Sequence, residues 1–148
     1  MQSARDAARP SDDREATEQT RATVSAFLRA LSHGGRYGDH LAEDATHTLM
    51  ETGEVAHGRD AIVGLVDHLH HQAFAGSPIV RSLVAEGSRA AVEGEFVGRH
   101  VGEFAGIAPT GRTVRVPFAA AYDLAGGTIG ALRVYLPMDA LVRQLRAT

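Results

Sequence analysis

The chain ends in a segment whose residues could take part in acid–base chemistry on a small molecule. Arg133 and Tyr135 stand two residues apart in RVYLPMDALVRQL, so on a strand both side chains would point to one face. The next position on that face is Pro137, which has no acid–base chemistry. His47 and His100, in other strand-like segments, could carry a proton near neutral pH, where histidine ordinarily titrates.

Alternation of apolar and polar residues predicts which strand faces are buried. His100 follows Phe96 at an even spacing, so both should point inward. A single inward histidine is more often a hydrogen-bonded core group than a catalyst. In residues 112–124 one alternating set is apolar, includes Phe118 and Tyr122, and should face the core.

The last strand-like segment, residues 128–136, has two faces of different character. Its apolar face consists of Leu132, Val134 and Leu136. The other face carries Arg133 and Tyr135. Two such faces predict two environments, one a dimer interface and the other a polar-lined pocket. The alternative is that Arg133 is a surface charge.

The segment HLHH, residues 68–71, raises the possibility of a metal site. On the helix predicted for residues 59–74, His68 and His71 share a face, but no HExxH motif and no further ligand spacing accompany them. Partly exposed helix histidines are the favoured interpretation, and no metal is expected. His70 follows Val66 by one turn, so it borders the apolar stripe and could face the interior.

Two other patterns favour structural interpretations. AGGTIG lies between two strand-like runs with no helix after it, which indicates a hairpin turn rather than a dinucleotide loop. Glu93 and Glu95 share a strand face and could form a glycosidase-like pair, but a solvated face is the more common explanation.

Composition narrows the possible functions. The chain has 148 residues, a net charge of −3 and neither cysteine nor lysine. It therefore has no thiolate nucleophile, disulfide or Schiff-base lysine. With no basic block and no long apolar run, neither nucleic acid nor a membrane is expected as a partner. Because the N-terminal segment is polar, we expect a cytoplasmic protein.

The order of periodic segments predicts the fold class. Residues 1–10 are expected to be a disordered tail and residues 11–148 a single domain. An apolar helical stripe ends at Gly34, and a short helical piece follows at residues 36–44. The remaining elements are strands at 46–51 and 54–58, a helix at 59–74, and strands at 79–86, 89–101, 112–124 and 128–136. This order predicts an α+β fold, with helices on one face of a curved sheet.

Several segments in this order resemble the SnoaL-like polyketide cyclases of the nuclear-transport-factor-two-like superfamily, whose relatives include limonene epoxide hydrolase and ketosteroid isomerase. They are LAEDATHTLMETGEVAHGRDAI, GRHVGEFAGIAPTGRTVRVP and YDLAGGTIGALRVYLPMDALVRQL. The resemblance runs from about Thr20 to Leu145. It implies a cone-shaped antiparallel sheet wrapped around about three helices, an internal apolar pocket and a homodimer formed through the outer sheet face.

The resemblance also implies a chemistry: enolisation of a carbonyl compound followed by aldol closure, without metal or organic cofactor. His100 matches the histidine of the family's G-T-H-x-G segment, and Arg133 and Tyr135 match its R-x-Y. Many relatives carry an aspartate where this chain has Pro137. Asp139 is two residues away and should lie in the first turn of a helix, where its charge is favourable.

Three functions follow as hypotheses. The first is a cyclase or isomerase of secondary metabolism acting on a polyketide-like or epoxide-bearing substrate. Its expected acid–base groups are His100, His47, Tyr135 and Asp123, with Arg133 stabilising an oxyanion. Its expected substrate-binding residues are Phe96, Phe118, Tyr122, Leu69, His70 and Val66. The second is a module that binds a hydrophobic small molecule without chemistry, and the third is a dimeric accessory protein.

Overall fold

The computed structural model describes residues 10–147. Their elements, in chain order, are α1 (Pro10–Ser32), a 3-10 turn (Tyr37–His40), β1 (Leu41–Leu49), β2 (Glu54–His57), α2 (Arg59–Asp67), a π-helical turn (His68–Ala73), β3 (Phe74–Glu86), β4 (Arg89–His100), β5 (Thr113–Ala125), β6 (Thr128–Tyr135) and α3 (Met138–Arg146). The predicted tail lies outside the described residues, except that Pro10 begins α1. Within the described part, no helix has the length and hydropathy that a membrane crossing requires.

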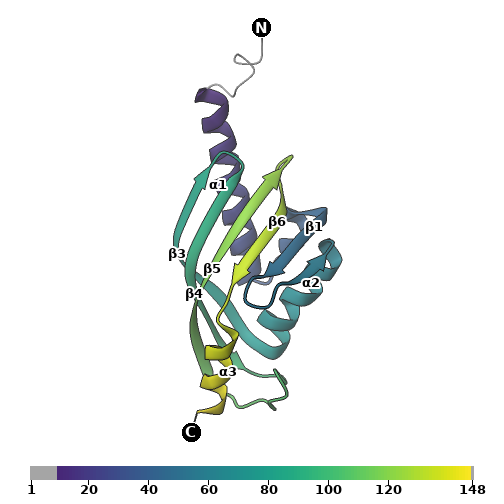
Figure 1. The fold of residues 1–148 in the computed structure, drawn as a ribbon, viewed down its shortest axis with the longest axis vertical. Coiled ribbons are helices and arrows are strands. Elements are labelled where there is room, and N and C mark those ends of the chain that lie inside the picture. Colours follow the sequence, from purple (N-terminus) through teal and green to yellow (C-terminus); the bar gives the residue numbers. More distant parts are fainter. Residues whose placement is uncertain (1–9, 148) are drawn as a thin grey trace.

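The strands form one six-stranded sheet in the order β2-β1-β6-β5-β4-β3. Neighbouring strands are antiparallel except for β1 and β6, which run parallel (Figure 1). The predicted α+β architecture, a curved sheet against helices, is confirmed. The sheet is mixed rather than wholly antiparallel, because β1 reaches β6 without a hairpin.

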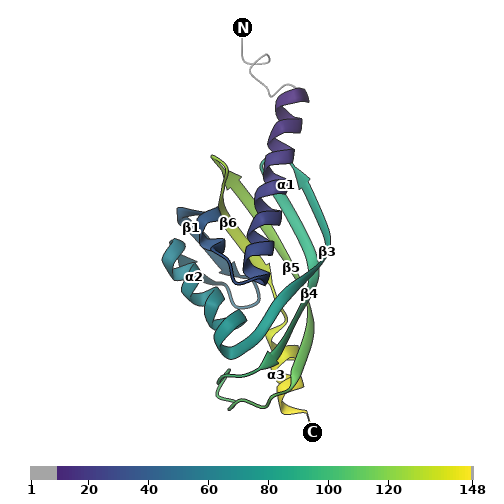
Figure 2. The same ribbon diagram turned by 180° about the vertical axis from the view of Figure 1, so that it is seen from behind.

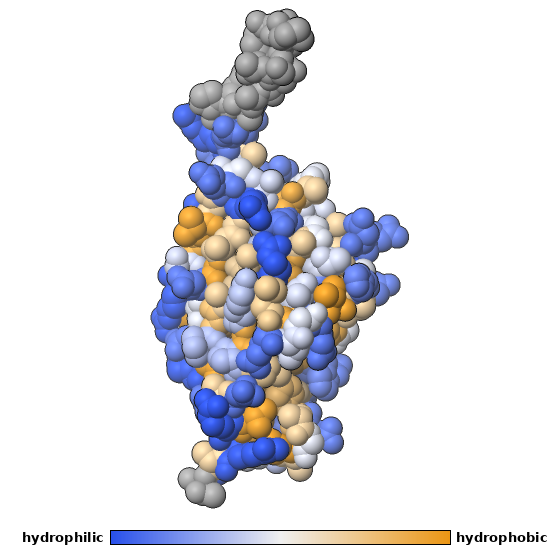
Figure 3. Space-filling model, viewed as in Figure 1, coloured by the Kyte–Doolittle hydropathy of each residue, from blue (hydrophilic) through white to orange (hydrophobic). Residues whose placement is uncertain are grey.

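The helices α1 and α2 lie against one face of the sheet, as Figure 2 shows. The predicted stripe on α1, which includes Val24, Phe27 and Leu31, is buried there, together with Ile62 and Val66 of α2. Burying a side chain of this size stabilises the fold by roughly 1.5–3 kcal/mol. The opposite face, seen in Figures 1 and 3, is not covered by α1 or α2 and mixes apolar with hydrophilic patches.

Glycine allows β3 and β4 to approach closely where the sheet bends. The register of the two strands shifts between Val80 and Ser82, which marks a β-bulge. A Cβ on Gly94 of β4 would come within 2.1 Å of the carbonyl oxygen of Ile79. No other residue fits this position without moving β3, so the bend depends on Gly94.

The helix α3 covers an open stretch of β5. Pairing between β5 and β6 stops at Ala119 and Tyr135, which leaves the first part of β5 without a neighbour on that side. The Gln144 side chain fills the gap, since its amide donates to the carbonyl of Arg115 at 2.8 Å and accepts from that residue's N–H at 2.9 Å. A side chain therefore satisfies two backbone groups that a strand would otherwise pair.

Three predicted element boundaries were wrong. The expected helical piece at 36–44 is a 3-10 turn of four residues, after which β1 begins at Leu41. The expected helix at 59–74 ends as an α-helix at Asp67 and continues as a π-helical turn. The strand expected at 79 begins at Phe74 and includes Pro78, which is tolerated because β3 is an edge strand.

Candidate functional site

A cavity of about 180 Å³ lies between the helices and the inner face of the sheet. Its wall is made by α1, the end of α2, the π-helical turn and five of the strands, together with the loop after β4 and the start of α3. The lining residues are Phe27, Leu28, Leu31, His47, Leu49, Leu65, Val66, His68, Leu69, His70, Pro78, Phe96, Phe104, Phe118, Ala120, Tyr122, Leu132, Val134, Leu136 and Met138. We call this space the interior cavity.

Four of the lining residues, His47, His68, His70 and Tyr122, carry polar side-chain groups. The rest are aliphatic or aromatic, and the described wall contains no carboxylate, arginine or hydroxyl other than that of Tyr122. An apolar space with a few convergent polar groups is typical of a small-molecule site. In such surroundings a neutral histidine can act as a base or hydrogen-bond acceptor.

His47 lies on the inner face of β1, in register with Leu132 of β6. It is buried, and its Nδ1 atom has no hydrogen-bond partner within the described residues. Burial lowers the pKa of His47, an effect that its own backbone carbonyl partly opposes. The ring is therefore neutral at pH 7, with one nitrogen unpartnered.

His70 lies in the π-helical turn that follows α2, and it lines the cavity. Its ring packs edge-on against Phe96, with 5.1 Å between ring centroids, and its Nδ1 atom also has no partner within the described residues. Burial, assisted by the neighbouring His71, lowers the pKa of His70 to about 4. Short π-helical segments are frequent at functional sites.

Tyr122 of β5 supplies the hydroxyl of the cavity wall. Burial raises the pKa of Tyr122, so its hydroxyl keeps its proton. The ring packs edge-on against Phe27 of α1. A protonated phenol in an apolar wall can donate a hydrogen bond to a carbonyl or enolate oxygen.

His100 is fully buried but does not line the interior cavity. Its Nδ1 atom accepts a hydrogen bond from the Thr110 N–H at 3.1 Å and lies 3.1 Å from the hydroxyl of that residue. Its ring lies against Phe74, which belongs to an apolar cluster with Phe96 and Leu141. The inward direction predicted for His100 is correct, but the residue holds the loop after β4 rather than facing the cavity.

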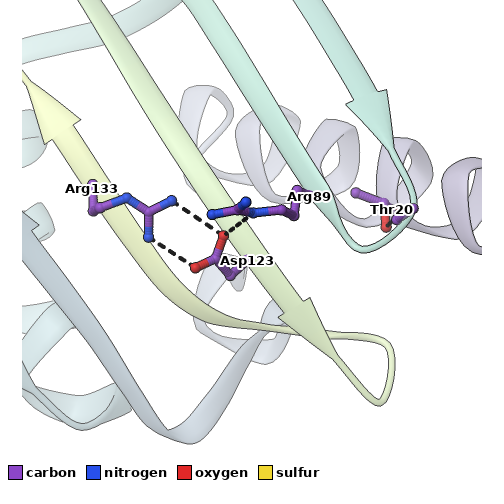
Figure 4. Close-up of polar contacts among 5 residues, drawn as sticks. Thr20, Arg89, Asp123 and Arg133 are labelled. Atoms are coloured by element: carbon purple, nitrogen blue, oxygen red, sulfur yellow. Dashed lines mark hydrogen bonds and ion pairs between the residues drawn. The ribbon is translucent and has the colours of Figure 1, made fainter.

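Arg133, Tyr135 and Asp123 lie on the outer face of the sheet, so their predicted place in the pocket is wrong. Arg133 makes a two-point ion pair with Asp123, with nitrogen–oxygen distances of 2.9 and 3.2 Å, and Arg89 reaches the same carboxylate from β4 (Figure 4). Hydrogen bonds from Arg133, which has the larger effect, and from Arg89 hold the pKa of Asp123 below its ordinary value. Tyr135 is 48% exposed.

The position of Arg133 follows from the pattern of β6. Leu132, Val134 and Leu136 gain more from the apolar interior than Arg133 would, and an unpaired guanidinium there would be costly. The apolar face of β6 therefore lines the cavity. The polar face turns outward, where Asp123 is available.

The six residues predicted to bind substrate all lie on the cavity wall: Phe96, Phe118, Tyr122, Leu69, His70 and Val66. Their contact with a ligand stays a prediction. The cavity wall also includes His68, which is exposed at its edge, and Met138 at the start of α3, neither of which was predicted to bind substrate. The position of His68, one turn after the lining residue Leu65, is a signal that could have indicated it. Among the described residues, no three histidine, aspartate or glutamate side chains come together to hold a metal ion.

Comparison with solved structures shows the same fold in several bacterial proteins. A proposed SnoaL-like polyketide cyclase from Jannaschia sp. CCS1 has a TM-score of 0.81 at 19% identity, covering 90% of this chain and 95% of that one. A proposed polyketide cyclase from Xanthomonas campestris pv. campestris has a TM-score of 0.75 at 23% identity, covering 87% and 98%. A proposed ketosteroid isomerase from Kribbella flavida has a TM-score of 0.66 at 21% identity, covering 82% and 79%.

Comparison with curated proteins gives no match. A family model described as SnoaL-like polyketide cyclase matches residues 24–145, which include α2, all six strands and most of α3. This range also contains every residue of the interior cavity. The chain therefore belongs to the SnoaL-like polyketide cyclase family.

Proposed function

We propose that the protein is a cyclase or isomerase that moves a proton on a neutral carbonyl compound held in the interior cavity. The observation that carries this proposal is a pair of histidines, the buried His47 and the partly buried His70, whose Nδ1 atoms are buried without a partner among the described residues in an otherwise apolar wall. Unpartnered buried polar atoms are rare and need a partner or a role. A polyketide-like substrate offers acidic C–H groups and hydroxyl groups to these nitrogens, and its carbonyl oxygens can accept from the Tyr122 hydroxyl.

The size and polarity of the cavity define the substrate class. A protein cavity of roughly 150 Å³ accepts benzene, so about 180 Å³ suits a body of one or two rings. No described charged group faces the space to pair with an ionic substrate, and burying an unpaired ion would be costly. The substrate is therefore a neutral, flat ketone or keto-ester, and any further part of it extends past His68 at the exposed edge of the wall.

His47 is the base in this proposal. His70, with a pKa of about 4, is too weak a base to hold a proton at neutral pH and acts as a hydrogen-bond acceptor. His47 takes the proton from the carbon beside a carbonyl, and Tyr122 donates a hydrogen bond to the resulting enolate oxygen. In a cyclase, the enolate carbon then forms a bond to a second carbonyl carbon, and the new alkoxide takes the proton back from His47. All atoms and protons balance without a cofactor.

A two-ring ketone, 2-tetralone, tests the proton transfer directly. NMR of the bound probe in heavy water measures the exchange of its acidic C–H protons, while the methyl signals of Leu132 and Val134 report binding in the cavity. We expect faster exchange than in buffer, and at least a tenfold loss in His47→Gln, because general-base catalysis contributes about 10²–10⁴-fold. His57→Gln, at an exposed histidine of β2 outside the cavity, is the matched control and should behave as wild type.

A second function is favoured by the absence of a carboxylate from the described wall. Without an acid beside its histidines, the cavity could hold a hydrophobic molecule and leave it unchanged. Binding of 2-tetralone with no accelerated exchange, or with equal exchange in wild type and His47→Gln, would refute the acid–base proposal and establish binding alone.

We also propose that the outer face of the sheet forms a homodimer. Three small side chains, Ala91, Ala119 and Ala121, occupy neighbouring strands of this face, so a second sheet can approach closely there. Light scattering on the purified protein measures the mass. A dimer that Ala121→Arg converts to a monomer would support this interface, and a monomeric wild type would refute it.

A further inference from the structure

A second cavity opens on the surface between α1 and β3, and nothing in the proposed reaction uses it. It measures about 270 Å³ and lies where α1 runs along the edge strand β3 (Figure 2). We call it the α1–β3 groove. It is separate from the interior cavity, although Leu28 contributes to the walls of both.

One side of the groove is polar and positively charged. Ser25, Arg29 and Ser32 line it from α1, and His33 lines it from the turn that follows. Since Ser25, Arg29 and Ser32 are spaced by four and three residues, they form one continuous face at the end of the helix, and His33 follows directly after it. Arg29 is exposed, and its guanidinium has no hydrogen-bond or ion-pair partner within residues 10–147. By contrast, Arg21, about two helical turns earlier, donates a hydrogen bond to the carbonyl of Leu83 at 3.3 Å.

The floor of the groove is apolar. Leu28, Val80 and Leu83 form it, and Val80 is 41% exposed. An exposed valine beside an unpaired arginine leaves two chemically different surfaces open to one ligand. No aspartate or glutamate lines the described groove, so nothing within it competes for the charge of Arg29.

We propose that the α1–β3 groove binds a small carboxylate that has an apolar body. The carboxylate pairs with the guanidinium of Arg29, whose fork of N–H donors matches two carboxylate oxygens. The Ser25 and Ser32 hydroxyls lie on the same helix face and can donate to it. The apolar body covers Val80 and Leu83, which removes exposed hydrocarbon from water.

The two cavities should sort ligands by charge. The interior cavity has no described cation to pair with a carboxylate, so an ion is excluded there by the cost of losing its hydration. The groove supplies the cation at the surface, where that cost is small. Because Leu28 lines both spaces, a ligand in the groove contacts the outside of the wall that the substrate touches from within.

Methyl NMR on the full-length protein tests the proposal with two matched probes, 1-naphthoate and its uncharged relative 1-naphthalenemethanol. We expect 1-naphthoate to shift the methyl signals of Val80 and Leu83 in a saturable manner, and the alcohol to shift mainly Leu132 and Val134. Arg29→Gln should weaken 1-naphthoate binding tenfold or more, as expected for loss of a charge-assisted hydrogen bond. Arg143→Gln, at an exposed arginine of α3, is the matched control.

Two results would overturn the proposal. One is that 1-naphthoate shifts only the methyl groups of the interior cavity. The other is that it titrates alike in wild type, Arg29→Gln and Arg143→Gln. Neither depends on catalysis, so failure of the acid–base reaction and failure of the groove are distinguishable.

Discussion

Acidification should destabilise the fold through His70. The pKa of its ring is about 4 in the folded protein, against about 6.5 in the unfolded chain. The unfolded state therefore binds a proton more readily as the pH falls below 6.5. The stabilisation linked to neutral His70 is complete above that pH and is lost progressively as the pH falls towards 4.

The size of the effect follows from the two pKa values. A shift of about 2.5 units corresponds to roughly 3 kcal/mol once both states are protonated. Between pH 7.5 and pH 5, the free energy of unfolding should decrease by about 2 kcal/mol through this residue alone. His47, whose pKa is also lowered by burial, adds a loss of the same sign.

Urea unfolding followed by circular dichroism at pH 7.5 and pH 5 measures the difference. His70→Gln cannot be protonated, so it should lose about 2 kcal/mol less than wild type over this interval. His33→Gln, at an exposed histidine, is the matched control and should follow wild type. If His70→Gln and wild type lose the same stability, His70 is not held neutral by burial, and the argument that it serves as an acceptor fails.

Four further substitutions have expected effects on the free energy of unfolding, which urea unfolding measures. Gly94→Ala should destabilise the protein by about 2 kcal/mol or more, since its Cβ would meet a carbonyl oxygen of β3 at 2.1 Å. Gly64→Ala, in α2, should instead stabilise the protein by about 0.5–1 kcal/mol, because no atom lies within 4 Å of the added Cβ. Arg133→Ala should cost only about 0.2–1 kcal/mol, because the ion pair is partly exposed, and should leave binding in the interior cavity unchanged in a ligand titration. Gln144→Ala should cost about 1–3 kcal/mol, as it leaves two backbone groups of β5 without partners.

Much of the fold could be predicted because local patterns and tertiary structure agree. The stripe that includes Val24 and Phe27 predicted a helix with one buried face, and that face is buried. Alternation in residues 112–124 predicted that Phe118 and Tyr122 point inward, and both line the cavity. Such patterns are readable because burial of apolar surface selects one face of each element.

The face of β6 that lines the cavity was predicted wrongly, although the sequence contained the signal. Asp123 belongs to the outward set of its strand, and the hairpin through Gly126 and Gly127 places β6 beside it. Arg133 must then share the outer face with Asp123. A match to the R-x-Y motif does not by itself determine which face of the strand points inward.

The inward direction of His70 was predicted from its spacing to Val66, but the π-helical turn that contains it was not. A π-helical turn depends on how the end of α2 meets β3, and no residue type specifies it. The role of His100 was likewise hidden, since its partner Thr110 lies ten residues away in a loop without a regular pattern. Tertiary packing determines both.

The packing of α3 on β5 also prevents this strand edge from pairing with a second copy of the chain. An unpaired strand edge is a template for pairing with another chain. If α3 detaches, the N–H and C=O of Arg115 become free, beside the buried and β-prone residues Val114 and Val116. The side chain of Gln144 thus blocks pairing of this strand edge with another chain. Loss of Gln144 should therefore appear first as aggregation on storage.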